Sequence, residues 1–110
     1  MPTVTAEGME IIFSDYKREP TGVEGMELLT MDLTYRNPNH SRSEPVRPPE
    51  MELRDDLGNV YTVVTEDTFT QPIEPGESVR ANPRFEVNVE AQTLDLVVSP
   101  GGEDETHVEL

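Results

Sequence analysis

The segment Glu27–Asn39, ELLTMDLTYRNPN, constrains the fold most strongly, because apolar and polar side chains alternate along it from Leu29 to Arg36. One face carries Leu29, Met31, Leu33 and Tyr35, and the other carries Thr30, Asp32, Thr34 and Arg36. This period of two predicts a β-strand with one buried face and one face in water. The strand is expected to end at Asn37-Pro38-Asn39, because proline has no N–H donor and restricts the residue before it.

Further strands are predicted on both sides of this segment. Their expected ranges are Met9–Tyr16, Glu50–Asp55, Val60–Thr65, Ser78–Glu90, Thr93–Ser99 and Thr106–Leu110. Turns are expected at Lys17–Gly25, Asp55–Asn59, Glu74–Glu77 and Pro100–Gly102, where glycine and proline cluster. Pro83 falls in the middle of one predicted strand and therefore indicates an edge position or a bulge.

About seven strands separated by turns every 8 to 12 residues are typical of a sandwich. The sequence therefore predicts a single all-β domain over residues 1–110, built from two antiparallel sheets, with a small barrel as the alternative. Residues 1–8 are expected to be a loose lead-in with at most a short edge strand around Val4. Ile11, Phe13 and Asp15 are expected to share one face of the first long strand, with Ile12 and Ser14 on the other. Val89 is expected to face inward, and Phe69 and Ile73 are expected to be plugs under the loop that follows.

The chain is strongly acidic, with 23 Asp and Glu against 8 Lys and Arg and a net charge of −15. Because the acids are spread over the whole sequence, they indicate the solvated surface of a folded domain. Such a surface repels nucleic acid and anionic lipid. It suits a salt-adapted source, and a genome that favours Arg over Lys is the alternative explanation, since Lys17 is the only lysine.

The sequence contains no cysteine, so disulfides, thiolate metal sites and cysteine nucleophiles are excluded. No apolar run approaches the roughly 18 residues of a membrane span, and no signal peptide opens the chain. The protein is therefore either cytoplasmic or a chain from which an export signal has been removed. A monomer is expected, because the charge opposes pairing of edge strands between two copies.

Catalytic motifs are missing from the sequence. There is no Gly-x-Ser-x-Gly segment and no glycine-rich phosphate loop, so neither an enzyme nor a bound cofactor is predicted. His40 and His107 are too few to predict a transition-metal site. Asp55 and Asp56 with Asn59 could offer oxygen ligands to Ca²⁺, but a turn is the preferred interpretation because the spacing is not that of an EF-hand.

The loop Asn37–Pro49 is the candidate binding patch. It is rich in proline, and Arg36, Arg42, Arg47 and His40 lie in or beside it on an otherwise acidic chain. An ordinary connecting loop is the alternative. An aromatic side chain exposed anywhere on the surface would also indicate a recognition patch.

Four turn and core motifs resemble an uncharacterised immunoglobulin-like domain family of secreted proteins and lipoproteins of bacteria and archaea. This family is related in fold to a mycobacterial immunoprotective secreted antigen. The motifs are Tyr35–Asn37, Asp55–Tyr61, Pro75–Glu77 and Phe85–Val87, within residues 23–99. The resemblance implies an immunoglobulin-like sandwich that is usually exported and has no established catalytic residues.

The segment Leu33–Asn39 also resembles, less closely, the strand and Asn-Pro-Asn signature of the late-embryogenesis-abundant, water-stress type of domain. Three functions follow as expectations. The first is a non-enzymatic immunoglobulin-like module, extracellular or in the cell envelope, that binds an unknown protein partner or serves as an accessory domain. The second is a soluble stress-protective sandwich, and the third is a domain that binds Ca²⁺ or another cation through acidic loops.

Overall fold

The computed structural model describes residues 3–38, 44–64 and 71–110. Within these ranges the chain forms nine β-strands and no helix. The strands are β1 (Thr3–Ala6), β2 (Met9–Pro20), β3 (Met26–Arg36), β4 (Met51–Asp55), β5 (Val60–Thr62), β6 (Ser78–Ala81), β7 (Arg84–Asn88), β8 (Leu94–Val98) and β9 (Thr106–Glu109). The all-β prediction is therefore confirmed, although the strands number nine and not about seven.

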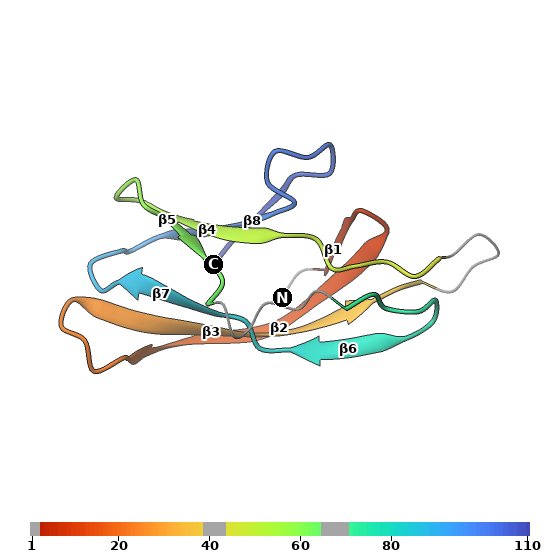
Figure 1. Cartoon of the computed structure of the whole chain (residues 1–110). Helices are drawn as coiled ribbons and strands as arrows, with labels where there is room; N and C mark the ends of the chain where they lie inside the picture. Colours follow the sequence, from red (N-terminus) through yellow and green to blue (C-terminus); the bar gives the residue numbers. More distant parts are fainter. Residues whose placement is uncertain (1–2, 39–43, 65–70) are drawn as a thin grey trace.

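The strands form two antiparallel sheets that pack face to face, so the predicted sandwich is confirmed (Figure 1). The five-stranded sheet has the order β1-β2-β3-β6, and β7 also pairs with β3. The four-stranded sheet has the order β5-β4-β8-β9. The molecule measures 50 × 25 × 23 Å, and its long axis follows the β2–β3 ribbon (Figure 1).

Strand β3 is the centre of the larger sheet, as the alternation predicted. It pairs with β2 along one edge and with β6 and β7 along the other. Leu29, Met31 and Leu33 are fully buried, and Tyr35 is 3% exposed. Opposite them, Leu53 and Leu96 of the smaller sheet complete the hydrophobic core. Removal of this apolar surface from water is the main force that holds the two sheets together.

The predicted single strand Ser78–Glu90 is wrong in one respect, because it forms two strands, β6 and β7. They lie end to end along β3 and are separated at Asn82-Pro83. Proline has no N–H to donate to the neighbouring strand, although the Pro83 carbonyl still accepts a 3.0 Å hydrogen bond from the Met31 N–H. The prediction that Val89 faces inward is also wrong, because β7 ends at Asn88 and leaves Val89 49% exposed.

Strand β2 is longer than predicted, since it continues from Tyr16 to Pro20 in the segment expected to turn. A β-bulge lies between Phe13 and Asp15, so that Tyr16 and not Asp15 shares a register position with buried Met31. Because a bulge inserts one residue, it reverses the faces of the side chains that follow. Asp15 is therefore exposed and does not share the face of Ile11 and Phe13, which corrects the prediction that the three lie on one face.

The remaining predictions about the core have mixed outcomes. Val4 and Ala6 are buried in β1, so the short edge strand around Val4 is confirmed. Ile73 is 1% exposed and plugs the core as predicted. Phe69 lies outside the described residues.

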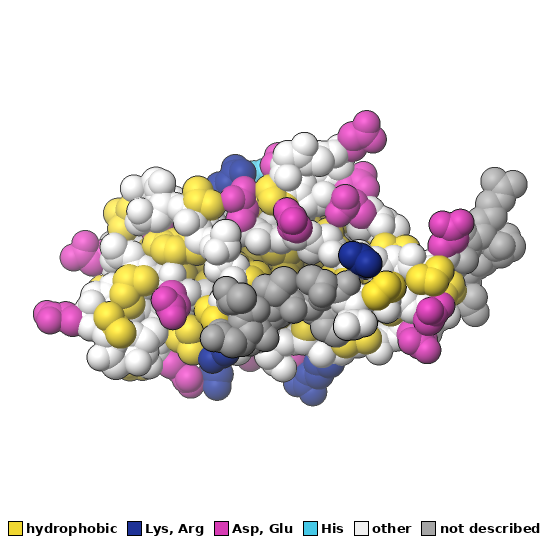
Figure 2. Space-filling model, in the orientation of Figure 1, with side chains coloured by type: hydrophobic (Ala, Val, Ile, Leu, Met, Phe, Trp, Pro, Cys, Tyr) yellow, Lys and Arg dark blue, Asp and Glu magenta, His cyan; other side chains and the backbone are white. Residues whose placement is uncertain are grey.

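Acidic side chains are distributed over the visible face of the molecule, with few basic ones between them (Figure 2). This distribution agrees with the interpretation of the negative charge as a solvated surface. Nowhere in the described ranges is there a helix with the length and apolar character needed to cross a membrane.

Candidate functional site

The Ca²⁺ candidate Asp55 ends β4 and organises the turn to β5. Its Oδ1 accepts hydrogen bonds from the backbone N–H groups of Leu57 and Asn59, at 2.9 and 2.8 Å. Its Oδ2 accepts one from the Asn59 side chain at 3.0 Å and one from the Tyr61 hydroxyl at 2.5 Å. Both carboxylate oxygens are therefore engaged within the turn, as the turn-forming interpretation requires.

These contacts shift the acidity of both partners. Partial desolvation raises the pKa of Asp55, but hydrogen bonds from Tyr61, Asn59 and Leu57 outweigh it and lower that pKa to about 2. The pKa of the Tyr61 hydroxyl is raised by desolvation and by its bond to Asp55. The same hydroxyl accepts a 3.1 Å hydrogen bond from the Asn88 N–H, so Tyr61 connects β4 of one sheet to β7 of the other.

The carboxylate of Asp56 does not join Asp55 and Asn59, the other two Ca²⁺ candidates. Its Oδ1 accepts hydrogen bonds from the backbone N–H groups of Gln92 and Thr93. Among the described residues, no group of three or more His, Asp or Glu side chains could hold a metal ion. Asp55, Asp56 and Asn59 thus serve here to fasten two turns.

The second histidine, His107 on β9, lies in a surface cluster on the smaller sheet. Its Nδ1 is 2.5 Å from Asp95 Oδ2, and its Nε2 is 3.5 Å from Glu105 Oε2. The hydrogen bond to Asp95 raises the pKa of His107 above its ordinary value, and Glu105 adds to this effect. The cluster holds the edge strand β9 against β8.

The four candidates for a binding patch are not brought together in the described structure. His40 and Arg42 lie outside the described residues. Arg36 is on the outer face of the larger sheet, 3.9 Å from Glu10 of β2. Arg47 lines a cavity.

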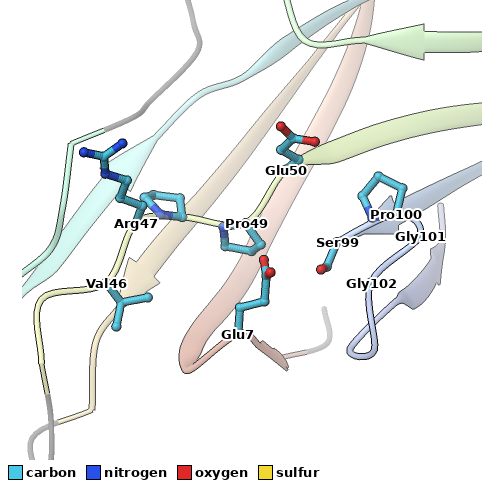
Figure 3. Close-up of a pocket in the computed structure, with 10 residues that line it drawn as sticks. Glu7, Val46, Arg47, Pro49, Glu50, Ser99, Pro100, Gly101 and Gly102 are labelled. Atoms are coloured by element: carbon cyan, nitrogen blue, oxygen red, sulfur yellow. The ribbon is translucent and has the colours of Figure 1, made fainter.

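That cavity is an open cleft of about 490 Å³ between three segments that are distant in the sequence (Figure 3). Val46–Glu50 of the proline-rich loop forms one wall, Ser99–Gly102 of the β8–β9 turn forms another, and Glu7 of the β1–β2 turn closes it. We call this the proline cleft. The Glu7 carboxylate and the Ser99 hydroxyl point into it, whereas the Arg47 guanidinium is turned away from both (Figure 3).

The wall made by the proline-rich loop is fixed by a buried asparagine. Asn37 is 2% exposed, and its side-chain amide donates hydrogen bonds to the carbonyls of Glu44 at 2.6 Å and Ile73 at 2.7 Å. Val46 and Ile73 then exchange two backbone hydrogen bonds, of 3.1 and 2.8 Å. These contacts hold the loop against the core at Glu44 and Val46, although neither residue belongs to a strand.

Hydrogen bonds across the molecule hold the other two walls. The Ser99 N–H donates to the Glu50 carbonyl at 2.7 Å, which joins the end of β8 to the loop before β4. The Glu7 N–H donates to Asp104 Oδ2 at 2.8 Å, across 97 residues of sequence. Asp104, in the acidic segment Glu103–Glu105, therefore has a structural contact in addition to its exposure to water.

Glu7 and Ser99 have an uncommon backbone conformation. They are the two non-glycine residues with positive φ in the described ranges, at +52° and +56°, and both line the proline cleft. Such backbone costs about 1–3 kcal/mol per residue and persists only where the surroundings impose it. Gly102 packs closely beside Ser99, because a Cβ there would come within 2.8 Å of the Ser99 hydroxyl oxygen and force it to move.

Several polar side chains of the cleft have no partner among the described residues. The side chains of Glu7, Arg47 and Glu50 form no hydrogen bond or ion pair with any other described residue. Ser99 is only 6% exposed, yet its hydroxyl also has no partner among the described residues. Sequence reasoning found Arg47 but missed Glu7, Glu50 and Ser99, since no periodic signal places two turns and a loop beside one another.

Exposed apolar side chains lie elsewhere on the surface. Tyr16 is the aromatic residue that stands out, at 36% exposure on the inner face of β2 beyond the end of β1. Val23, Leu57 and Val89 are also exposed, in the turns at the far end of the β2–β3 ribbon (Figure 1). They are not part of the proline cleft.

Comparison with known proteins yields a likeness of fold only. No model of a known protein family matches the chain, and no curated protein does either. A conserved hypothetical protein from Bacillus anthracis, solved as a crystal structure, is similar with a TM-score of 0.64 and 16% sequence identity. The similarity covers 94% of this chain and 91% of that protein. It supports the same sandwich arrangement and carries no functional assignment.

Proposed function

We propose that this chain is a non-enzymatic binding or accessory module of an exported protein, extracellular or held in the cell envelope, with an immunoglobulin-like sandwich. The observation that supports it best is the proline cleft, which collects unpartnered polar side chains on a rigid framework. Binding groups are commonly carried on loops that a scaffold positions, and this cleft follows that plan. The module acts as a monomer and recognises a protein partner.

The arrangement of the cleft favours recognition over catalysis. Glu7, Glu50 and Ser99 are supplied by three separate connections, and each backbone is fixed by hydrogen bonds that do not use the side chain. A Ser nucleophile needs a base within hydrogen-bond reach, and the Ser99 hydroxyl has no hydrogen-bond partner among the described residues. Fixed polar groups around an accessible cleft can instead give orientation to a bound group.

The proposal can be tested by nuclear magnetic resonance on the ¹⁵N-labelled chain. Peptides, saccharides, amino acids and nucleotides are titrated at constant ionic strength, and the backbone amide shifts are mapped. We expect one class to shift the amides of Ser99, Gly101 and Gly102, and the shifts to weaken in Gly102→Ala, in which the new Cβ displaces the Ser99 hydroxyl. If no class shifts these amides, or if all shifts occur elsewhere, the cleft is not a binding site and the proposal fails.

The compartment is tested separately. An antibody raised against the folded chain is used to probe cytoplasmic, membrane and extracellular fractions of the source cells. Recovery in the extracellular or membrane fraction is the expected result, and recovery only in the cytoplasm contradicts export.

A further inference from the structure

We propose that the proline cleft receives a primary ammonium group, supplied by a lysine side chain on a basic segment of the protein partner. This inference rests on the proposed binding function and adds the chemistry of the ligand. Its first support is the unpartnered Glu7 carboxylate, which points into the cleft together with the Ser99 hydroxyl (Figure 3). Ser99 is 94% buried by area, since 6% is exposed, and it lies in the wall of the cleft.

The second support is a shortage of unused hydrogen-bond donors around Glu7 and Ser99. Pro48, Pro49 and Pro100 have no N–H. Five other backbone N–H groups of the cleft already donate within the protein, namely those of Glu7, Val46, Ser99, Gly101 and Gly102. The unused capacity around Glu7 and Ser99 is therefore dominated by acceptors, and it fits a ligand group that donates.

An ammonium group meets this requirement better than an anion does. It carries a positive charge and three donors, which can be shared between the Glu7 carboxylate and the Ser99 hydroxyl. The rings of Pro49 and Pro100 provide apolar surface beside these oxygens, against which the methylene stem of a lysine can lie. Arg47 does not oppose the ammonium, because its guanidinium is directed away from Glu7 and Ser99 (Figure 3).

The charge of the whole molecule favours the same class of partner. A net charge of −15 attracts a basic segment and speeds its encounter with the surface. The cleft is open to solvent, which suits a side chain projecting from a larger partner. We therefore assign the ammonium to a protein-borne lysine in preference to a free amine.

The test uses the whole chain and three probes at a fixed ionic strength. The first probe is a short peptide with one lysine between glycines, capped at both ends. The second is the same peptide with the lysine acetylated, which removes the charge and two donors. The third is 1,5-diaminopentane, a free amine. Binding is followed by the backbone amide shifts of Ser99, Gly101 and Gly102.

The decisive variant is Glu7→Gln, and its matched control is Glu24→Gln. Both remove one negative charge, but Glu24 lies in the β2–β3 turn, beyond the whole length of the 12-residue strand β2. At about 3.3 Å per residue, this separates it from Glu7 by roughly 40 Å. Ser99→Ala is a second variant that keeps the charge, and thermal unfolding shows whether each variant is folded.

We expect the lysine peptide to shift the cleft amides and the acetylated peptide to shift them little. Glu7→Gln should weaken binding about tenfold or more, Ser99→Ala about three- to tenfold, and Glu24→Gln less than about twofold. Equal weakening by Glu7→Gln and Glu24→Gln would mean general attraction to an acidic surface and would overturn the proposal. If Glu7→Gln does not fold, an unchanged affinity in Ser99→Ala overturns it instead.

Other outcomes distinguish this inference from the proposed function. If the free diamine binds more tightly than the lysine peptide, the protein-borne source is wrong. If the acetylated peptide or an anionic ligand shifts the cleft amides and the lysine peptide does not, the ammonium assignment fails while the binding function stands. If no ligand of any class shifts them, both fail.

Discussion

Replacement of Asn37 by alanine should destabilise the protein markedly, because this one side chain holds the proline-rich loop to the core. The residue is 2% exposed and donates hydrogen bonds to the carbonyls of Glu44 at 2.6 Å and Ile73 at 2.7 Å. Each hydrogen bond contributes about 1 kcal/mol net, and a buried group left unpaired costs about 1–3 kcal/mol. The Ile73 carbonyl keeps its bond from the Val46 N–H, so only the Glu44 carbonyl loses its partner.

The expected fall in the free energy of unfolding is therefore about 2–4 kcal/mol, a large part of the roughly 5–15 kcal/mol typical of a domain. It is measured by urea unfolding followed by far-ultraviolet circular dichroism. The matched control is Asn82→Ala, since Asn82 is exposed and its amide donates at 3.2 Å to the Met31 carbonyl. This control should cost less than about 1 kcal/mol.

A third variant, Asn37→Asp, separates donation from packing. A carboxylate of similar size cannot donate to two carbonyls, whereas its protonated form can donate to one of them. The loss of stability relative to the natural chain should therefore be greater at pH 7 than near pH 3. If the free energies of unfolding of Asn37→Ala and Asn82→Ala differ by less than about 0.5 kcal/mol, the buried amide does not hold the loop and the reasoning is refuted.

Four further predictions concern polar contacts and the charged surface. Tyr61→Phe should lower the free energy of unfolding by about 1–2 kcal/mol in urea, because the hydroxyl bridging Asp55 and the Asn88 N–H is lost; an unchanged value contradicts the bridge. The pKa of Asp55 in the folded protein is about 2, below its ordinary value of 3.8. Its contribution to stability should therefore be complete above about pH 4 and disappear as the pH falls toward 2. Asp55→Asn should remove this part of the acid unfolding curve. The pKa of His107 is raised, so its effect on stability depends on pH in the opposite direction. Its contribution to stability is complete below about pH 6.5 and is lost as the pH rises through the pKa of the folded state. In a titration followed by proton resonances, Asp95→Asn should lower the pKa of His107. Finally, the melting temperature should rise with NaCl concentration, because screening reduces self-repulsion at a net charge of −15. Ca²⁺ at matched ionic strength should not raise it further, since both carboxylate oxygens of Asp55 already accept hydrogen bonds. Extra stabilisation by Ca²⁺ would restore the cation-binding alternative.

The central strand was predictable from the sequence because its signal is local and repetitive. Leu29, Met31 and Leu33 alternate with polar residues, and this pattern is explained only by a strand with one buried face. Pro83 predicted an edge position or a bulge within the strand, and β6 and β7 are separated at this residue. The bulge after Phe13 was not predictable, since one inserted residue leaves no compositional trace.

The candidate site was much less accessible to prediction. Arg47 was found because a basic residue in a proline-rich loop of an acidic chain is conspicuous. Glu7 and Ser99 were not, because each is an ordinary residue in its own turn. Two signals existed in principle: Glu7 directly precedes Gly8 in the β1–β2 turn, and Ser99 opens the sequence Ser-Pro-Gly-Gly. Both indicate tight turns, and neither indicates that the turns meet.

The sequence by itself determined that the fold is all-β, because alternation with a period of two requires strands with one buried face, and the tertiary structure decided between a sandwich and a barrel. It also determined the acidic surface and the placement of most turns, since these depend on residue types at neighbouring positions. Only the tertiary structure decided which turns meet. The contact of Glu7 with Asp104 spans 97 residues, and the order of the strands in two sheets brings these residues together. The proline cleft is a product of that order, because its three walls come from connections that no local pattern links.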